Sequence, residues 1–356
     1  MRATGVLDPL TGIVDWLVGL LPTSVPPVTL PADERGHTSP GEWWYFVGHL
    51  TASDGSDRRY AFEVTVVRVG DPVFGVGLEF LGYFAFVDLR ARSYEGADRL
   101  AMPSAYTSTP AGFRVVLPEA AATDWVVESR TDVGGRRVYE LDVATAQRGV
   151  HLDLQETKPA VLHGQNGVAD FGGGARMSYY SRTRLAVTGM AWDGQVNRPV
   201  TGLAWMDHEW GLPRLIGRKW KFFAIQLDDN TDVAVYRVWR KGTPDALVTY
   251  GARIDAGGGV AQIAPELIEV TDPNTPLPDG YPVHNRITIA APWDLSLLIV
   301  PYVTDQRRRP STPHALYPIW WEGACQVTGT GPAGATLTGR AFVELGGWEP
   351  IDAVLA

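Results

Sequence analysis

Three segments of the sequence combine paired tryptophans with ionisable side chains, at residues 42–49, 205–211 and 317–323. A carboxyl group that lies beside indole rings loses contact with water, which raises its pKa and keeps it protonated near neutral pH. Such a group can donate a proton, and nearby aromatic faces can stabilise a developing cation. These segments therefore favour acid catalysis on an alkene or an enone.

The spacing within the second segment divides its side chains between two faces if the segment is a β-strand. Alternate side chains of a strand share a face, so Trp205, Asp207 and Glu209 would lie together. His208 and Trp210 would lie on the opposite face. Asp207 and His208 can then point into the same barrel only if a β-bulge re-aims one of them.

The same parity places Glu42 with Trp44, and Trp320 with Glu322. The candidate catalytic residues are Asp207, His208 and Glu42. The candidate substrate-binding residues are Trp44, Tyr45, Tyr180, Trp205, Trp210, Trp239, Trp320 and Trp321. The alternative role for the glutamates is to tie strand ends together through buried hydrogen bonds, and the alternative role for the tryptophans is to fill the core.

The elements that must position these residues are predicted to be β-strands. Apolar and polar residues alternate over Tyr60 to Val66 and over Tyr83 to Leu89, which is typical of half-buried strands. Further strands are predicted at 113–117, 125–129, 137–143, 150–156, 221–227, 232–240, 247–254, 286–291, 295–300, 319–327 and 336–345. No helical pattern of comparable length separates them, so we expect an all-β fold with antiparallel barrels or sandwiches.

The chain has 356 residues, which is enough for two domains. We expect a helix and linker over residues 1–31, one β domain over 32–205 and a second over 206–356. The short amphipathic helix is expected within Leu10 to Leu21, packed onto the body of the protein. That stretch is too short and too acidic to cross a membrane or to act as a signal peptide, so we expect a cytoplasmic protein without stable membrane insertion.

Composition and missing motifs disfavour several classes of function. The net charge of -9 argues against a nucleic-acid partner, and the single cysteine, Cys325, cannot form an intramolecular disulfide. The sequence contains neither a glycine-rich nucleotide-binding loop nor a Gly-x-Ser-x-Gly nucleophile motif. The seven histidines lack the local spacing of a zinc site. We therefore expect no cofactor and no metal, and the oligomeric state stays open.

Five motifs carry a resemblance to a known family. They are EWWYFVGHL, SYYSRTRL, VTGLAWMDHEWG, KWKFFAIQLDD and YPIWWEGACQVTG. As a set they resemble the hydroxyneurosporene synthase and AttH-like family, from about His37 to Trp348. The resemblance implies two lipocalin-like domains. The family includes carotenoid hydratases and cyclases of secondary metabolism, among them [4+2] enzymes that act on polyketide chains.

The resemblance also implies a role for one aspartate. Asp207 occupies the position of the proton donor in the hydratase branch. Where that branch tends to carry a tyrosine two residues earlier, this sequence has Trp205, and the segment GRAFVELGGW also departs modestly from the common form. The departure at Trp205 weakens the case for strict carotenoid hydration.

Our leading hypothesis is a cofactor-independent cyclase or isomerase, for example of the [4+2] type, for an apolar, polyunsaturated, polyketide-like substrate. Asp207 or His208 would donate a proton or hydrogen bond, with Glu42 and Tyr180 orienting the donor. Preorganisation of a flexible substrate can supply roughly 7 to 11 kcal/mol of the barrier reduction. One alternative is a hydratase that adds water to a carotenoid or isoprenoid alkene. Another is a lipocalin-like carrier that binds an apolar ligand without chemistry.

Overall fold

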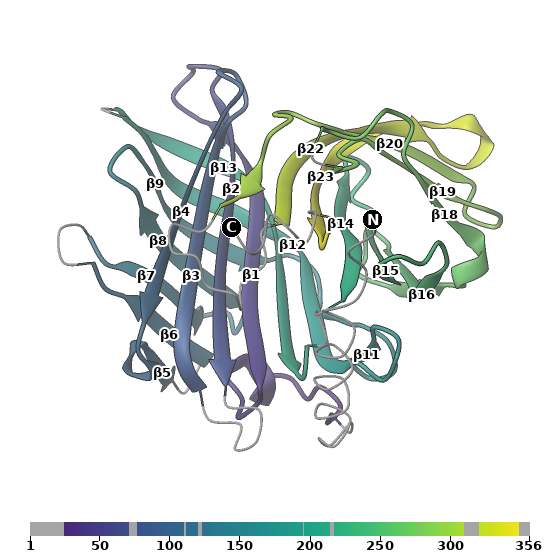
Figure 1. The fold of residues 1–356 in the computed structure, drawn as a ribbon. Helices are drawn as coiled ribbons and strands as arrows, with labels where there is room; N and C mark the ends of the chain where they lie inside the picture. The colour runs from purple at the N-terminus through teal and green to yellow at the C-terminus, as the bar shows by residue number, and fades with distance from the viewer. Residues whose placement is uncertain are drawn as a thin grey trace, which may run out of the picture.

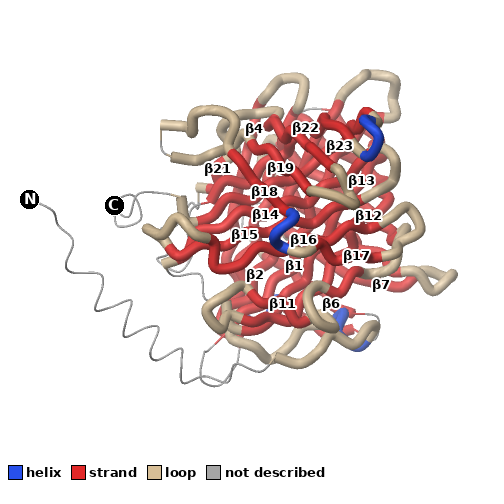
Figure 2. Tube along the Cα trace, turned by 90° about the vertical axis from the view of Figure 1, so that its right-hand side faces the viewer, coloured by secondary structure: helices blue, strands red, loops and turns tan. Residues whose placement is uncertain are grey.

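The computed structural model describes residues 25–70, 77–109, 112–119, 123–194, 196–213, 217–278, 280–309 and 320–348. The helix predicted within Leu10 to Leu21 lies outside these residues. Strands make up most of the described chain, as the red tube of Figure 2 shows. The helices of the described chain are four short 3-10 turns, η1 (Ala32–Glu34), η2 (Pro103–Ala105), η3 (Pro265–Leu267) and η4 (Pro332–Gly334). The all-β prediction is confirmed, and within the described residues no helix has the length and apolar character needed to cross a membrane.

The first sheet curls into a half-barrel, coloured purple to teal in Figure 1. Its strand order is β4-β3-β2-β1-β13-β12-β9-β8-β7-β6-β5, with β10 and β11 also paired to β12. The bounds are β1 (Gly41–Ala52), β2 (Arg59–Gly70), β3 (Gly77–Asp88), β4 (Ser93–Ala101), β5 (Tyr106–Thr109), β6 (Gly112–Leu117), β7 (Trp125–Thr131), β8 (Arg137–Ala144), β9 (Arg148–Glu156), β10 (Val161–Leu162), β11 (Val168–Asp170), β12 (Arg176–Asp193) and β13 (Val196–Gly211).

The second sheet forms a nearly closed barrel, green to yellow in Figure 1. Its order is β17-β16-β15-β14-β23-β22-β20-β19-β18, with β21 also paired to β22. The bounds are β14 (Arg218–Leu227), β15 (Asp232–Arg240), β16 (Ala246–Ile254), β17 (Val260–Ile263), β18 (Ile268–Thr271), β19 (Asn285–Ile289), β20 (Leu295–Pro301), β21 (Arg307–Arg308), β22 (Trp320–Thr330) and β23 (Thr336–Gly346).

The chain passes from the first sheet to the second between Gly211 and Arg218. The predicted division between residues 205 and 206 therefore falls inside β13. This strand belongs to the first sheet, where it pairs antiparallel with both β1 and β12.

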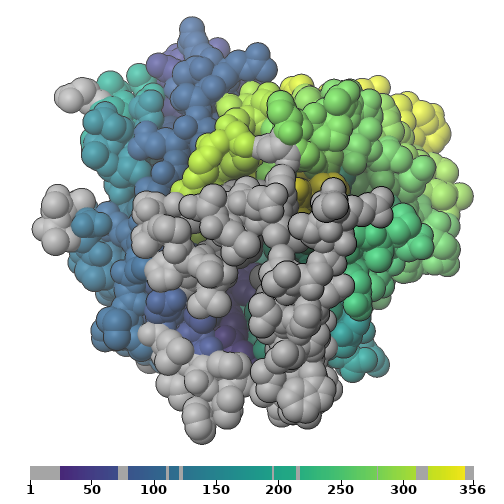
Figure 3. Space-filling view, viewed as in Figure 1, coloured from purple at the N-terminus to yellow at the C-terminus, as the bar shows by residue number. Residues whose placement is uncertain are grey.

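Three apolar layers hold the fold together. One fills the half-barrel and a second fills the other barrel. The third lies between the two sheets, whose coloured halves rest against each other in Figure 3. We call this third layer the seam. Its buried apolar residues are Tyr45, Val47, Ala61, Val87, Ala169, Tyr179, Trp205, Phe222, Ala224, Ala234, Tyr236, Val238, Ala324 and Phe342.

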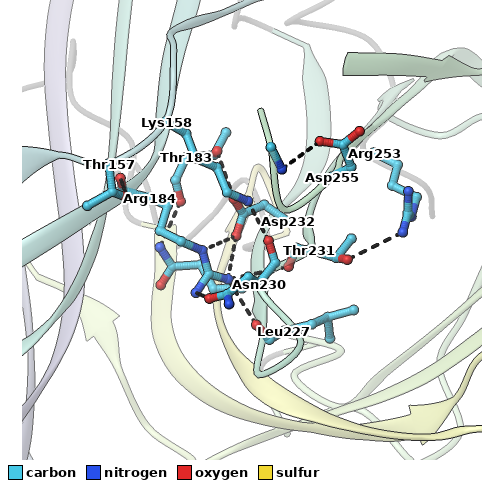
Figure 4. A network of polar contacts seen from close by, with 12 residues as sticks. Thr157, Lys158, Thr183, Arg184, Leu227, Asn230, Thr231, Asp232, Arg253 and Asp255 are labelled. Atoms are coloured by element: carbon cyan, nitrogen blue, oxygen red, sulfur yellow. Dashed lines mark hydrogen bonds and ion pairs between the residues drawn. The ribbon is translucent and has the colours of Figure 1, made fainter. Parts of the chain in front are cut away.

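A buried ion-pair network fixes the two sheets to each other (Figure 4). The register of β12 shifts between Arg182 and Leu185, and such a bulge re-aims side chains toward the second sheet. Arg184 Nη2 lies 2.7 Å from Asp232 Oδ1, and Lys158 Nζ lies 2.7 Å from Asp232 Oδ2. Thr183 donates to the same carboxylate over 3.0 Å. Asp232 in β15 is thus the shared counter-charge of two cations from the first half of the chain.

We expect Asp232→Ala to lower the free energy of unfolding by about 3 to 5 kcal/mol, because it leaves Arg184 and Lys158 buried without their counter-charge. Chemical denaturation followed by tryptophan fluorescence measures this loss. The matched control is Asp153→Ala, which removes a half-exposed ion pair to Arg130 and should cost less than about 1 kcal/mol. Similar losses in the two variants would contradict the role given to Asp232.

Candidate active site between the two sheets

The pairing of β1 with β13 decides which candidate residues meet. The register runs without a shift from Gly41 to Ala52 and places Tyr45 opposite Asp207, and Trp44 opposite His208. Directly opposed side chains share a face of a sheet. Asp207 therefore lies in the seam with Tyr45, whereas His208 lies inside the half-barrel with Trp44. The predicted separation of Asp207 from His208 is confirmed.

The carboxyl group of Asp207 is buried, with 2% of the residue exposed. It accepts hydrogen bonds at Oδ1 from the Ser181 hydroxyl and from Trp205 Nε1, the latter over 2.7 Å. Burial raises the pKa of Asp207 to about 7, although hydrogen bonds from Ser181, Trp205 and Tyr179 oppose the shift. The bonds from Ser181 and Trp205 both reach Oδ1, so we assign the proton to Oδ2. Near neutral pH the group is available as an acid.

A chain of hydrogen bonds leads from Asp207 to the edge of the seam. His163 Nε2 lies 2.6 Å from Ser181 Oγ, and His163 Nδ1 lies 3.1 Å from the Tyr250 hydroxyl. Because Ser181 donates its proton to Asp207, its oxygen accepts from Nε2, which leaves Nδ1 to accept from Tyr250. Burial lowers the pKa of His163 to about 3, so its ring is neutral and has this single tautomer. Every donor in the chain thus points toward Asp207.

Three further carboxyl groups of the seam have indole partners. Trp43 donates to Glu209 over 3.1 Å, and burial raises the pKa of Glu209 well above its usual range. Trp220 donates to Glu344 over 2.7 Å, and burial raises the pKa of Glu344 to about 7. The third is Glu322, described next. The predicted pairing of indoles with protonated carboxyls is thus a property of the seam.

Glu322 links the two sheets across the seam. Its Oε1 accepts from the Tyr45 hydroxyl over 2.5 Å, and its Oε2 accepts from Trp320 Nε1 over 3.0 Å. Burial, followed by the neighbouring charge of Glu63, raises the pKa of Glu322 well above the usual range. Tyr45 lies on β1 directly opposite Asp207, and its bond to Glu322 connects β1 with β22, the strand that carries Trp320.

A small cavity of about 10 Å³ lies in the seam beside Trp205. It is lined by Val47, Gly48, His49, Trp205, Ala224, Gln226, Ala341 and Phe342. This volume has room for about one water molecule, whereas pockets for small ligands measure roughly 300 to 1,000 Å³. An extended substrate can therefore enter here only if side chains of the seam move apart.

The second predicted donor, His208, belongs to a separate cluster inside the half-barrel. His208 Nε2 lies 2.9 Å from Glu42 Oε1, and its Nδ1 lies 3.2 Å from the Tyr180 hydroxyl. Glu42 and Tyr180 therefore contact His208 and not Asp207. Their side chains lie on the same face of the first sheet as His208, whereas Asp207 lies on the other face. This corrects the expectation that they orient whichever group is the donor. His37, which sequence reasoning did not single out, completes the cluster at 2.8 Å from Glu42.

Glu42 differs from the seam acids in its protonation. Burial would raise its pKa, but hydrogen bonds from His208 and His37 outweigh burial and lower the pKa below its usual value. The group is therefore a carboxylate at neutral pH and has no proton to give. The ligand atoms of His37, Glu42 and His208 lie within 4.8 Å of one another, close enough for a metal ion, but they also bond to each other as described.

We expect Glu42→Gln to lower the free energy of unfolding by about 2 kcal/mol at pH 7, because charged hydrogen bonds are lost inside the half-barrel. A carboxyl with a lowered pKa stabilises the fold above its unfolded-state pKa, and the gain disappears as pH falls. The difference between variant and wild type should therefore shrink below about pH 4. Denaturant titrations at both pH values measure it. Glu128→Gln, in a half-exposed pair with Arg114, is the control. A cost that is independent of pH would contradict this role.

The other predicted substrate-binding residues divide between several environments. Tyr45, Trp205 and Trp320 gather at the seam. Trp210 and Trp44 lie in the half-barrel, with Trp210 stacked on His37 at 3.8 Å between ring centroids. Trp321 lies in the core of the second barrel, and Trp239 packs edge-on against Trp348. The last four therefore do not lie in the seam cluster around Asp207.

The family of the chain follows from comparison with known proteins. The model of the AttH-like family matches residues 22–348. This chain belongs to the AttH-like family. A search of curated protein sequences finds no match.

Solved structures share the fold of this AttH-like protein. A putative AttH from Nitrosomonas europaea is 23% identical with a TM-score of 0.77, covering 93% of this chain and 100% of that one. Kievitone hydratase from Nectria haematococca is 14% identical with a TM-score of 0.68, covering 92% and 95%. CghA with Sch210972 is 14% identical with a TM-score of 0.57, covering 87% and 89%. These likenesses show the fold.

Sequence reasoning missed Ser181 and His163. Ser181 follows Tyr180 in the motif SYYSRTRL, and the register of β12 with β13 places it directly opposite Asp207. If the pairing of β12 with β13 is assumed, the alternation of side chains along β12 is enough to predict that Ser181 lies beside Asp207. His163 carries no local signal, since it reaches the seam from the segment between β10 and β11.

Proposed function

We propose that this AttH-like protein is a cofactor-independent enzyme that uses Asp207 to activate an apolar, polyunsaturated substrate in the seam. Cyclisation or isomerisation of a polyketide-like chain is the reaction that this geometry supports best. The observation that carries the proposal is the carboxyl group of Asp207, which is buried among aromatic side chains and held by two directed donors. A carrier would gain nothing from such a desolvated acid.

The chemistry follows from the groups around Asp207. Oδ2 donates a proton or a hydrogen bond to a carbonyl or alkene of the substrate, and the negative charge that develops is stabilised at Oδ1 by Ser181 and Trp205. Aromatic faces of the seam stabilise a transient positive charge on the substrate. When the product loses its extra proton, Asp207 is protonated again. No atom is gained or lost overall.

A hydratase is the second candidate, and the small cavity favours it. The cavity has room for a single water molecule and is lined by Trp205, whose indole also bonds to Asp207. In this reaction Asp207 protonates an alkene and the water captures the resulting cation. The similarity in fold to kievitone hydratase supports this candidate.

Product mass separates these reactions. We would incubate the protein with a panel of conjugated polyenes and analyse the products by chromatography and mass spectrometry. A cyclase or isomerase yields a new compound of unchanged mass, whereas a hydratase product is heavier by one water. Recovery of tightly bound but unchanged ligand across the panel would contradict catalysis and favour the carrier.

A further inference from the structure

Arg308 of β21 is buried in the seam, with 2% of the residue exposed. Its guanidinium lies 3.9 Å from the ring centroid of Tyr83 in the first sheet and 4.1 Å from that of Trp320 in the second. The cation is thus held against rings from both sheets. Nη1 and Nη2 have no hydrogen-bond partner among the described residues. A buried cation without a partner is costly to the fold, so this arrangement requires an explanation.

The acids near Arg308 do not neutralise it. Within the described chain no carboxylate oxygen lies within ion-pair distance of the guanidinium, and Glu63 Oε2 also lacks a partner. Burial raises the pKa of Glu63 to about 7, even though the charge of Arg308 opposes the shift. Both oxygens of Glu322 are already bonded, to Tyr45 and Trp320. Below about pH 7 the site therefore offers one fixed positive charge, two free terminal donors and acids whose raised pKa values favour the protonated form.

We propose that Arg308 binds an anionic oxygen group of the substrate, either a carboxylate or the enolate of a 1,3-dicarbonyl. The planar fork of a guanidinium matches two such oxygens, and the rings of Tyr83 and Trp320 hold the guanidinium in place. This inference rests on the proposed function, because it gives the substrate in the seam an acidic end group. Tyr45 connects the two ends of the site, since it opposes Asp207 in the sheet and bonds to Glu322 beside Trp320.

The test compares all-trans-retinoic acid with its methyl ester as probes, by quenching of tryptophan fluorescence at pH 6. At this pH a free carboxylic acid is mostly ionised, whereas Glu63 and Glu344 stay mostly protonated because burial raises their pKa to about 7. We expect wild-type protein to bind the acid at least tenfold more tightly than the ester. Arg308→Gln should abolish this preference, and Arg308→Lys should restore part of it because it keeps the charge without the fork. Equal affinities for acid and ester in wild-type protein would overturn the proposal, as would a preference that survives in Arg308→Gln. The comparison of acid and ester in wild-type protein needs no variant, so it tests the proposal even if Arg308→Gln does not fold.

Asp207→Asn separates this inference from the proposed function. We expect that variant to keep the preference for the acid, because Arg308 and its flanking rings are unchanged. Loss of turnover in Asp207→Asn with the preference intact would support both proposals. Undiminished turnover with the preference intact would refute the proposed function and leave the Arg308 site standing. Loss of the preference in Asp207→Asn would refute Arg308 as an independent anchor.

Discussion

Asp207→Asn should lower kcat by about 100-fold to 10,000-fold, the usual contribution of a positioned general acid. Asparagine keeps the oxygen that accepts hydrogen bonds from Ser181 and Trp205, but its amide has no acidic proton to transfer. The packing of the seam and the binding of substrate should therefore persist. Turnover of a substrate found in the polyene panel, measured under saturating conditions, gives the effect.

Two controls accompany this measurement. Asp153→Asn changes a half-exposed aspartate on β9, paired with Arg130, and should leave kcat unchanged. His208→Ala tests the other predicted donor, which faces the half-barrel, and should change kcat by no more than a few-fold. A kcat for Asp207→Asn within a few-fold of wild type would exclude proton donation by this residue. Only the shape of the seam would then remain as a source of catalysis.

The second large effect concerns stability as a function of pH. The pKa of Asp207 rises from a usual 3.8 to about 7 on folding, so the folded protein binds the extra proton between these values. Between these two pH values the folded state binds one more proton than the unfolded state. A rise in pH removes protons and therefore favours the unfolded state, so the free energy of unfolding decreases through this window. Asp207→Asn removes this dependence. Relative to wild type, the variant should gain about 4 kcal/mol between pH 4 and pH 8.5.

Denaturant titrations of both proteins at four pH values measure the gain. Other acids of the seam are present in both proteins, so their contributions cancel in the difference except where the charge of Asp207 acts on them, as it does in raising the pKa of Glu209 beyond the effect of burial. The pair of wild type and Asp153→Asn is the matched control for the change from aspartate to asparagine itself. A difference between Asp207→Asn and wild type that stays constant with pH would show that Asp207 has an ordinary pKa in the folded protein.

Local alternation of residues was enough to predict the strands with clear periodicity and the separation of Asp207 from His208. The strands missed lack that signal. β4 (Ser93–Ala101), for example, is mostly exposed or half-buried, so no apolar stripe marks it. The very short strands β10, β11 and β21 are recognisable only through their partners.

The alternation of side chains along a strand could not reveal which face of the first sheet packs against the second sheet. Almost every residue of β1 is buried on both faces, so Trp44 and Tyr45 look equivalent in the sequence. Glu63, Glu344 and Arg308 come from distant strands with no paired tryptophan beside them. Their proximity depends on how two sheets pack, and no periodicity within a strand encodes that arrangement.

The protonation state of Asp207 in the folded protein can be measured without knowing the substrate. Protein labelled with ¹³C at the aspartate carboxyl carbon would be titrated by NMR, and the resonance missing from Asp207→Asn assigns the signal. We predict a titration midpoint near pH 7, with the neutral acid dominant at pH 6. A resonance that already reports the ionised carboxylate at pH 5 would contradict acid catalysis by Asp207.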